Sequence, residues 1–447
     1  MSVRNNWMNG LAGVALTFAL SGGALAAGVD DLGNSLTPVG AERAGNADGT
    51  IPAWTGGDLE VPAGWKTGDL RVDPYAGDAK LFSIDASNVD QYADKLSPGQ
   101  VAIVKRYDGY RMDVYPSRRS CGYSQELYDA TRANVGVAKL SEKGGILAGH
   151  GGFLFPLPEN GLQAIANYRT AFKGKHTNLT VNIINSQTDG NYVVNTGVIH
   201  TYAPYFEPNA REIDNEYMTK FVYKQIAPAA SVGGIIMTLQ PYDDSNESWV
   251  YIPGLRRVKK APTANYDTPG QDDIRTFDQT YMYNGLPDRY DWKLVGKQEL
   301  YVPYNASRFR TAGVHVSDII TNGKYPSRDL ARYELHRVWV VEATVKEGWR
   351  NTFSKRVFYM DEDTWTPVVA DLYDTKGNLY RFQENHIFMA PEMPGCVTAA
   401  DFYHDLNADR YVADNIIVGP GNANYAAGDV VDNSFFTPDS MRRYGRR

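Results

Sequence analysis

The chain between residues 178 and 390 consists of short apolar runs in the pattern of β-strands. Ten such runs are rich in Val, Ile, Thr and Tyr, and turns as short as that from Asp374 to Gly377 separate the last of them. β-Branched and aromatic residues favour strands, and short connections favour antiparallel pairing of consecutive strands. We predict strands at 179–184, 191–202, 217–226, 233–242, 247–252, 292–302, 332–345, 351–360, 367–374 and 378–389.

Several of these strands carry large apolar residues on both faces. Val338 to Val341 and Val357 to Met360 are unbroken apolar runs. A sheet with one solvated face would alternate apolar and polar residues instead. The pattern fits a curved sheet with helices or a ligand on its concave face. It fits a closely packed sandwich equally well, and periodicity alone does not separate the two.

Helices are predicted outside this region and at one place within it. Ser97 followed by Pro98 is a cap with proline at the first helical position, and similar signals begin at Ser124 and near residue 158. A fourth helix is predicted to start at Thr268-Pro269. A fifth is predicted at Thr398, because Phe402 and Leu406 follow it four residues apart.

The first 26 residues have the pattern of a cleavable signal peptide. Arg4 precedes an apolar run from Leu11 to Leu20, and Ala24-Leu25-Ala26 supplies the small residues that a signal peptidase accepts. The run is too short for the roughly 20 residues that cross a bilayer. We therefore expect export and cleavage after Ala26.

The organisation expected for the whole chain has four segments. They are the signal peptide at 1–26, an irregular arm with helices packing on the sheet at 27–177, the antiparallel β core at 178–390, and a helix and tail at 391–447. The sequence has no linker-like stretch, so residues 27–447 are expected to form one domain. The predicted fold class is mostly β.

Charge and cysteine content narrow the functional classes. The net charge is −7, and Arg4 is the only charged residue that signal-peptide removal would take away. An acidic chain argues against binding to nucleic acid. Only Cys121 and Cys396 occur. In an oxidising compartment such a pair favours a disulfide, although two buried free thiols are the alternative.

The sequence contains none of the common catalytic motifs. It lacks a zinc-binding His-Glu-x-x-His, a Cys-x-x-Cys pair, a nucleophile elbow and a phosphate-binding loop. The acidic pairs and triplets at 243–244 and 361–363 lack the spacing of a calcium loop, so we interpret both as solvated turns. We predict no cofactor, no metal and no enzymatic activity, although paired carboxylates brought together by folding stay possible.

Four segments resemble blocks of a known family. They are LTPVGAERAGNADGTIPAWTGG (36–57), GGFLFPLPENGLQAIANYR (151–169), WVYIPGLRRVKKAP (249–262) and KRVFYMDEDTWTPVVADLYDTKGNLYRFQ (355–383). Together they resemble the domain of unknown function 1329 of Gram-negative bacteria, described as similar to outer-membrane lipoprotein-sorting proteins. The resemblance extends over essentially all of the chain after the signal peptide.

The resemblance implies a lipoprotein-carrier-like fold and a periplasmic location. Such carriers have a half-open antiparallel β-barrel closed by helices, with an apolar cavity for acyl chains. The family is also thought to work beside inner-membrane transporters of the resistance-nodulation-division type and outer-membrane proteins. Whether the protein would be free in the periplasm or peripheral to the outer membrane stays open. No functional residues are carried over from the family.

Three functional hypotheses follow, in order of preference. The first is a periplasmic binding or carrier protein for a hydrophobic or amphipathic, lipid-like molecule. The second is a non-catalytic subunit of a cell-envelope assembly, and the third is an enzyme acting on a lipid or polymer. A one-residue error in register would invert any choice of inward-facing residues. The candidate cavity residues are Phe221, Tyr223, Trp249, Tyr251, Trp339, Val341, Val357 and Tyr359.

Overall fold

The computed structural model describes residues 28–270, 272, 274–320, 323–419, 423–424 and 431–446. The predicted signal peptide at 1–26 lies outside the described residues. Within them, the predicted strand-rich character is confirmed, because most of the regular structure is strand. Among these residues, no helix combines the length and the apolar character that a membrane crossing requires.

Sixteen of the described strands share one large sheet, and two more form a small hairpin. The strands of the large sheet are β1 (Phe82–Asp85), β2 (Arg111–Val114), β5 (His176–Ser186), β6 (Tyr192–Tyr202), β7 (Tyr217–Ala227), β8 (Ile235–Pro241), β9 (Glu247–Ile252), β10 (Arg257–Lys260), β11 (Tyr290–Pro303), β12 (Tyr333–Val345), β13 (Lys355–Asp361), β14 (Pro367–Tyr373), β15 (Leu379–Ala390), β16 (Gly395–Asp405), β17 (Arg410–Ile416) and β18 (Ala423–Asn424). The hairpin consists of β3 (Lys139–Leu140) and β4 (Ile146–Ala148).

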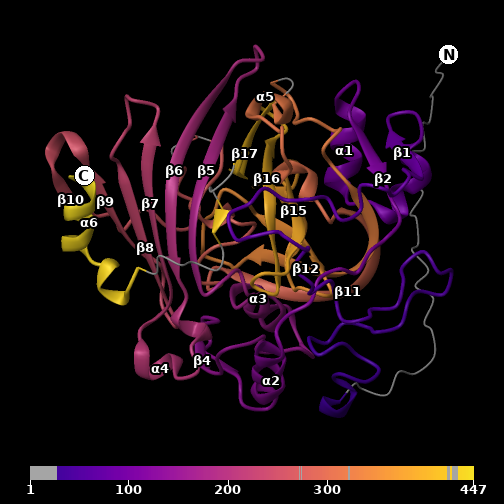
Figure 1. Cartoon of the computed structure of the whole chain (residues 1–447), viewed down its shortest axis with the longest axis horizontal. Coiled ribbons are helices and arrows are strands. Elements are labelled where there is room, and N and C mark those ends of the chain that lie inside the picture. The colour runs from indigo at the N-terminus through magenta and orange to yellow at the C-terminus, as the bar shows by residue number, and fades with distance from the viewer. Residues whose placement is uncertain are drawn as a thin grey trace, which may run out of the picture.

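The large sheet is built from two antiparallel meanders. One runs from β5 to β10 and the other from β11 to β17, with consecutive strands paired throughout each. They join where β17 pairs with β5, for example at Val412 opposite Asn185. β10 and β1 stand at the two ends of the strand order, so the sheet is open. Figure 1 shows β5–β10 on one side of the molecule and β11–β17 beside them.

Six α-helices and several 3₁₀ turns accompany the sheet. The helices are α1 (Pro98–Arg106), α2 (Gln125–Asn134), α3 (Gly161–Arg169), α4 (Ala210–Ile213), α5 (Val316–Ile319) and α6 (Pro438–Gly445), counted within the described residues. The 3₁₀ turns are Val29–Asp31, Val89–Lys95, Pro204–Phe206, Pro253–Leu255, Phe277–Gln279, Ser307–Arg310 and Asn433–Phe435.

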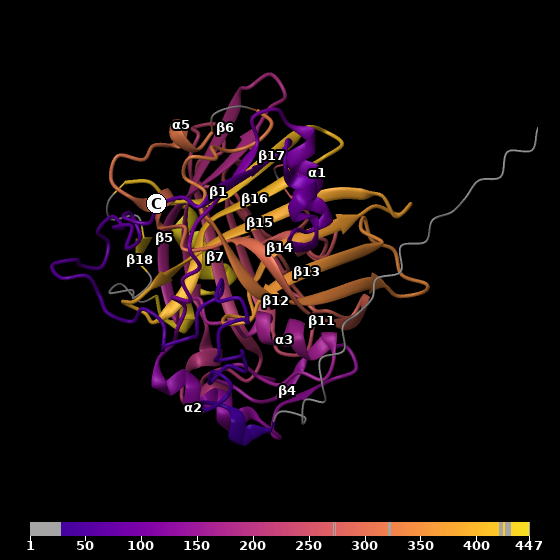
Figure 2. The same ribbon diagram turned by 90° about the vertical axis from the view of Figure 1, so that its right-hand side faces the viewer.

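The first three helices begin where the sequence predicts them. The Ser97 hydroxyl accepts a hydrogen bond from the Gln100 amide at 3.1 Å, and Ser124 caps α2 in the same way. The Asn160 side chain accepts from the Gln163 amide at 3.0 Å at the start of α3. Each cap satisfies an amide that the first helical turn leaves without a partner. In Figure 2, α1 lies over β15, and α2 and α3 lie below the sheet.

Two predicted helices are wrong. The segment from Thr398 is part of strand β16, so the sheet extends past residue 390 to Ile416. Phe402 and Leu406 do have helical spacing, but β16 lies between β15 and β17, where pairing satisfies its backbone. At Thr268, the described residues form an isolated bridge between Pro269 and Thr276, followed by the 3₁₀ turn at Phe277.

The acidic triplet at 361–363 is buried, not solvated as predicted. Its side chains are at most 2% exposed. The Arg119 Nη2 atom lies 2.7 Å from Asp363 Oδ1, and the Arg337 Nε atom lies 2.7 Å from Glu362 Oε1. Buried carboxylates are tolerated when cations pair with them. The cations come from the N-terminal arm and from β12, which the local sequence does not reveal.

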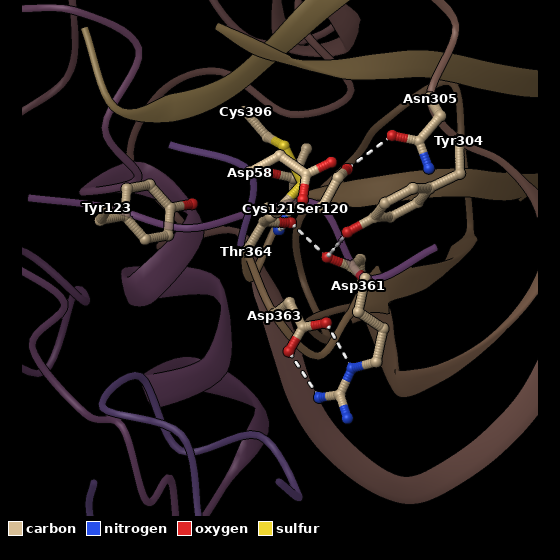
Figure 3. Close-up of a disulfide and its surroundings, with 12 residues drawn as sticks. Asp58, Ser120, Cys121, Tyr123, Tyr304, Asn305, Asp361, Asp363, Thr364 and Cys396 are labelled. Carbon is tan, nitrogen blue, oxygen red and sulfur yellow. Dashed lines mark hydrogen bonds and ion pairs between the residues drawn. A yellow bond between two sulfur atoms is a disulfide. The ribbon is translucent and has the colours of Figure 1, made fainter. Parts of the chain in front are cut away.

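The predicted disulfide between Cys121 and Cys396 is present. Their Cα atoms lie 5.5 Å apart, although 275 residues separate them in the sequence. Figure 3 shows the disulfide close to Asp361 and Asp363 of the buried acidic triplet. The Trp54 indole donates to the Cys121 carbonyl at 2.9 Å. The disulfide thus links the N-terminal arm to the first residues of β16.

Candidate functional site

A cavity of about 400 Å³ lies where the two meanders join. Strands β5 to β8 form one wall. The end of α3, the turn at Pro204–Phe206, described residues between 270 and 284, and residues of β16 and β17 lie around it. Its volume falls in the range of roughly 300–1,000 Å³ that small-molecule sites occupy. The wall on β5–β8 includes the apolar side chains Leu179, Ile183, Ile199, Phe221 and Ile236.

Strand alternation decides which side chains reach the cavity. On β8, Ile236, Thr238 and Gln240 line it, whereas Met237 and Leu239 point to the other face. Successive strand residues point to opposite faces, so a one-residue slip would exchange the two sets. On the outer face, Met237 and Leu239 pack in one cluster with Phe436 and with Met441 of α6. Figure 1 shows α6 beside β9 and β10, at the edge of the sheet.

The eight predicted cavity residues do not come together. Phe221 and Tyr223 line the cavity. Trp249 lies opposite Met237 and Tyr251 opposite Ile235, and both belong to the outer cluster under α6.

The other four candidates lie in the second meander. Trp339 stacks on Trp365 with ring centroids 5.7 Å apart, and Val341 packs in the same core cluster as Ala164 and Ile165 of α3. Val357 and Tyr359 belong to the largest core cluster. These residues were predicted to line a cavity because their strands carry apolar residues on both faces. In the structure, such strands are packed against protein on both faces.

Polar and charged residues of the cavity were missed altogether. Asn185, Thr201, Gln225, Thr238 and Gln240 share the inward face of β5–β8 with the apolar wall. A strand face that mixes polar and apolar residues does not show the alternation that marks one buried and one solvated face. No sequence signal identified the charged lining residues, which lie at the end of α3, in loops and on β17.

Arg275 pairs with both carboxylates of the described lining, Asp272 and Asp414. Its Nε atom donates to Asp272 Oδ2 at 2.6 Å, and its Nη1 atom pairs with Asp414. Burial alone would lower the pKa of Arg275, but the charges of Asp414 and Asp272 more than offset this and raise it. The guanidinium also lies 5.3 Å from the ring centroid of Tyr403. This side of the cavity is therefore a closed ion-pair network.

Lys173 and Arg169 are the other two basic residues of the lining. Both lie at the connection between α3 and β5. The Lys173 side chain is exposed, and partial loss of hydration beside the protein lowers the pKa of its amine to about 8. Its Nζ atom lies 4.1 Å from the ring centroid of Tyr168. Arg169 is buried, and its Nη1 atom donates to the Gly144 carbonyl at 2.8 Å.

Metal binding finds no support in the side-chain arrangement. Among the described residues, no group of three or more His, Cys, Asp or Glu side chains is placed to hold a metal ion. The charged lining residues instead provide an ion-pair network and two further cations beside an apolar wall. Such an arrangement can bind a molecule that has both an apolar part and a polar part.

Comparison with known proteins identifies the family. Residues 83–442 match the family described as a protein of unknown function, DUF1329. An uncharacterized protein of Pseudomonas aeruginosa is 39% identical over 430 residues, which cover 93% of each chain. The chain belongs to the DUF1329 family. The resemblance inferred from the sequence blocks is thereby confirmed, and the matched region contains the whole cavity wall.

Solved structures similar to this DUF1329 chain have low sequence identity. A putative outer membrane lipoprotein-sorting protein domain from Vibrio parahaemolyticus is 13% identical, with a TM-score of 0.45 over 63% of this chain and 98% of that one. A DUF1329 family protein from Desulfovibrio piger is 14% identical, with a TM-score of 0.41 over 62% and 95%. A LolA superfamily protein from Nitrosomonas europaea is 12% identical, with a TM-score of 0.37 over 63% and 99%.

Proposed function

We propose that this protein binds and carries a hydrophobic or amphipathic, lipid-like molecule in the periplasm. The observation that carries the proposal is the cavity of about 400 Å³ with an apolar wall on β5–β8. A ligand that covers apolar surface facing a cavity lowers the free energy, because that surface is removed from water. The signal-peptide pattern and the disulfide support an oxidising location outside the cytoplasm.

A binding role is favoured over an enzymatic one. The two carboxylates of the described lining, Asp272 and Asp414, both pair with Arg275. A catalytic acid or base must reach the substrate to exchange a proton with it. Here both carboxylates are held in ion pairs with one guanidinium, which favours a structural role for them in the cavity wall.

We further propose that the protein works with an inner-membrane transporter and an outer-membrane protein. It rests on the family resemblance. Crosslinking in intact cells of the native host, followed by purification of this protein, should recover a transporter of the resistance-nodulation-division type. Recovery of the protein without any envelope partner would contradict the proposed partnership but not the carrier role.

The carrier role is tested with the neutral, apolar fluorescent probe N-phenyl-naphthylamine. The wild-type protein should bind the probe and release it when a long-chain alcohol is added. Ile236→Arg places a charge on the cavity wall and should abolish probe binding. Ile226→Arg is the matched control, because Ile226 is 43% exposed on β7 and does not line the cavity. Equal probe binding by both variants would contradict the proposal.

A further inference from the structure

Lys173 presents a cation to the cavity without a carboxylate partner. Among the described residues, no ion pair within 4.0 Å joins its amine to a carboxylate, and Asp401 attracts it from a longer distance only when ionised. Its Nζ atom lies over the face of the Tyr168 ring, 4.1 Å from the ring centroid. A lysine amine that has lost part of its hydration is stabilised in its charged form by a nearby anion.

Arg169, four residues earlier in the chain, is a second cation, and some of its hydrogen-bond donors have no partner among the described residues. The residue is 8% exposed and lines the cavity, and its Nη1 atom is held by the Gly144 carbonyl. Its Nε and Nη2 atoms are buried and have no hydrogen-bond partner among the described residues, although the charges of Asp243 and Asp288 attract the guanidinium. Buried guanidinium donors are nearly always paired, and two adjacent N–H groups fit the two oxygens of a carboxylate or phosphate.

Basic residues outnumber acidic ones in the described lining. Arg169, Lys173 and Arg275 face Asp272 and Asp414, both of which pair with Arg275, while Asp243 and Asp288 attract Arg169 from outside the lining. Asp401 does not restore the balance at neutral pH. Burial and the charge of Asp414 raise its pKa to about 8, so its carboxyl stays mostly protonated.

We propose that Lys173 and Arg169 bind the anionic headgroup, a carboxylate or a phosphate, of an amphiphile whose apolar chain lies against β5–β8. The two cations lie on the α3–β5 connection, and Ile183, Ile199, Phe221 and Ile236 supply the apolar wall. A ligand with an anion at one end of an apolar chain satisfies both parts. This inference rests on the proposed carrier function and names the class of its cargo.

The test compares three probes that share one chain and differ in the headgroup. Dodecanoate, dodecyl phosphate and dodecanol compete with N-phenyl-naphthylamine for the wild-type protein at pH 7. Both anions should bind at least about tenfold more tightly than the alcohol, because hydrogen bonds to charged groups are the strong ones. The tighter of the two anions identifies the headgroup as carboxylate or phosphate.

Variants of Lys173 assign the preference to this residue. Lys173→Met should remove most of the preference for the anions and leave dodecanol binding unchanged, whereas Lys173→Arg should keep the preference. Lys173 is accessible, so the substitution should not disturb folding. Lys175→Met is the control, since Lys175 lies two residues away, pairs with Glu207 at 3.2 Å and does not line the cavity.

The outcomes separate this inference from the carrier proposal. Binding of all three probes with equal affinity would overturn the anion site and leave the carrier role intact. An anion preference that survives in Lys173→Met would also overturn the assignment to this residue. Failure of every probe to displace N-phenyl-naphthylamine would contradict the carrier role itself.

Discussion

Phe221 on β7 lies directly opposite Thr238 on β8, and both side chains line the cavity. The neighbouring pair, Val222 opposite Met237, points to the other face and packs beneath α6. The two faces of the same strands therefore have different roles. One faces the cavity, and the other anchors the C-terminal helix.

Substitutions on the two faces should have opposite effects. Phe221→Ala should weaken binding of N-phenyl-naphthylamine by about tenfold, since an aromatic contact with the ligand is lost. Met237→Ala should leave binding nearly unchanged but lower the free energy of unfolding by about 2–5 kcal/mol, because it opens a hole in a buried cluster. Fluorescence titration and urea unfolding measure the two quantities. The reverse pattern would show that the assigned register is wrong.

Loss of the disulfide should lower the stability of the fold and weaken ligand binding. Cys396 directly precedes Val397 and Thr398, which line the cavity. Replacing both cysteines with serine should lower the free energy of unfolding by about 2–5 kcal/mol and weaken probe binding. Thermal unfolding and probe titration of the double variant check this. Full binding in a destabilised variant would show that β16 holds its place in the wall without the disulfide.

Binding of an anionic probe should depend on pH near 8. The pKa of Lys173 is lowered to about 8 and that of Asp401 is raised to about 8, in both cases first of all by burial. As the pH rises past 8, Lys173 loses its positive charge and Asp401 gains a negative one. Both changes oppose a bound anion, so dodecanoate affinity should fall between pH 7 and 9. Dodecanol affinity, measured in parallel, should stay level.

Asp371 should stabilise the docking of α1 on the sheet. Its carboxyl accepts from the Ser97 hydroxyl at 2.9 Å, the Gly99 amide at 3.1 Å and the Tyr359 hydroxyl at 3.3 Å. Asp371→Ala leaves these buried donors without an acceptor and should lower the free energy of unfolding by about 1–3 kcal/mol. Glu347→Ala, at an exposed position, is the control and should change it little.

The same residue gives a pH-dependent test. Burial raises the pKa of Asp371 from 3.8 to about 7. Between these values the folded state holds a proton that the unfolded state releases, so the contribution of Asp371 to stability falls as the pH rises and is level above 7. Asp371→Asn removes this titration. Its stability relative to the wild type should therefore improve from pH 5 to pH 8 in urea unfolding, and a constant difference would contradict the assigned shift.

The sequence predicts the strands well because their signals are local. Val, Ile, Thr and Tyr runs bounded by short turns identify every strand from β5 to β15 except the short β10, and Ser97 marks the start of α1. Local signals fail at Thr398, where the helical spacing of Phe402 and Leu406 competes with pairing on both sides of β16. They fail again at Asp361 to Asp363, because the neutralising Arg119 and Arg337 come from distant parts of the chain.

The cavity lies beyond what local patterns can predict. One face of β7 and β8 lines the cavity because α6 covers the opposite face. α6 lies some 200 residues away in the sequence. Trp249 and Tyr251 show the consequence, since they are on the α6 side of their strand. Lys173 looks like an ordinary loop lysine until the fold places β16 and β17 across from it.

The carrier role with an anionic amphiphile as cargo is tested by native mass spectrometry with lipid extraction, on protein purified from the periplasm of its own host. We expect the wild-type protein to carry a single-chain anionic amphiphile that denaturation releases. We expect Ile236→Arg to be empty and Lys173→Met to carry less of this molecule. A wild-type protein that is empty, or that carries the same molecules as Ile236→Arg, would contradict the carrier role.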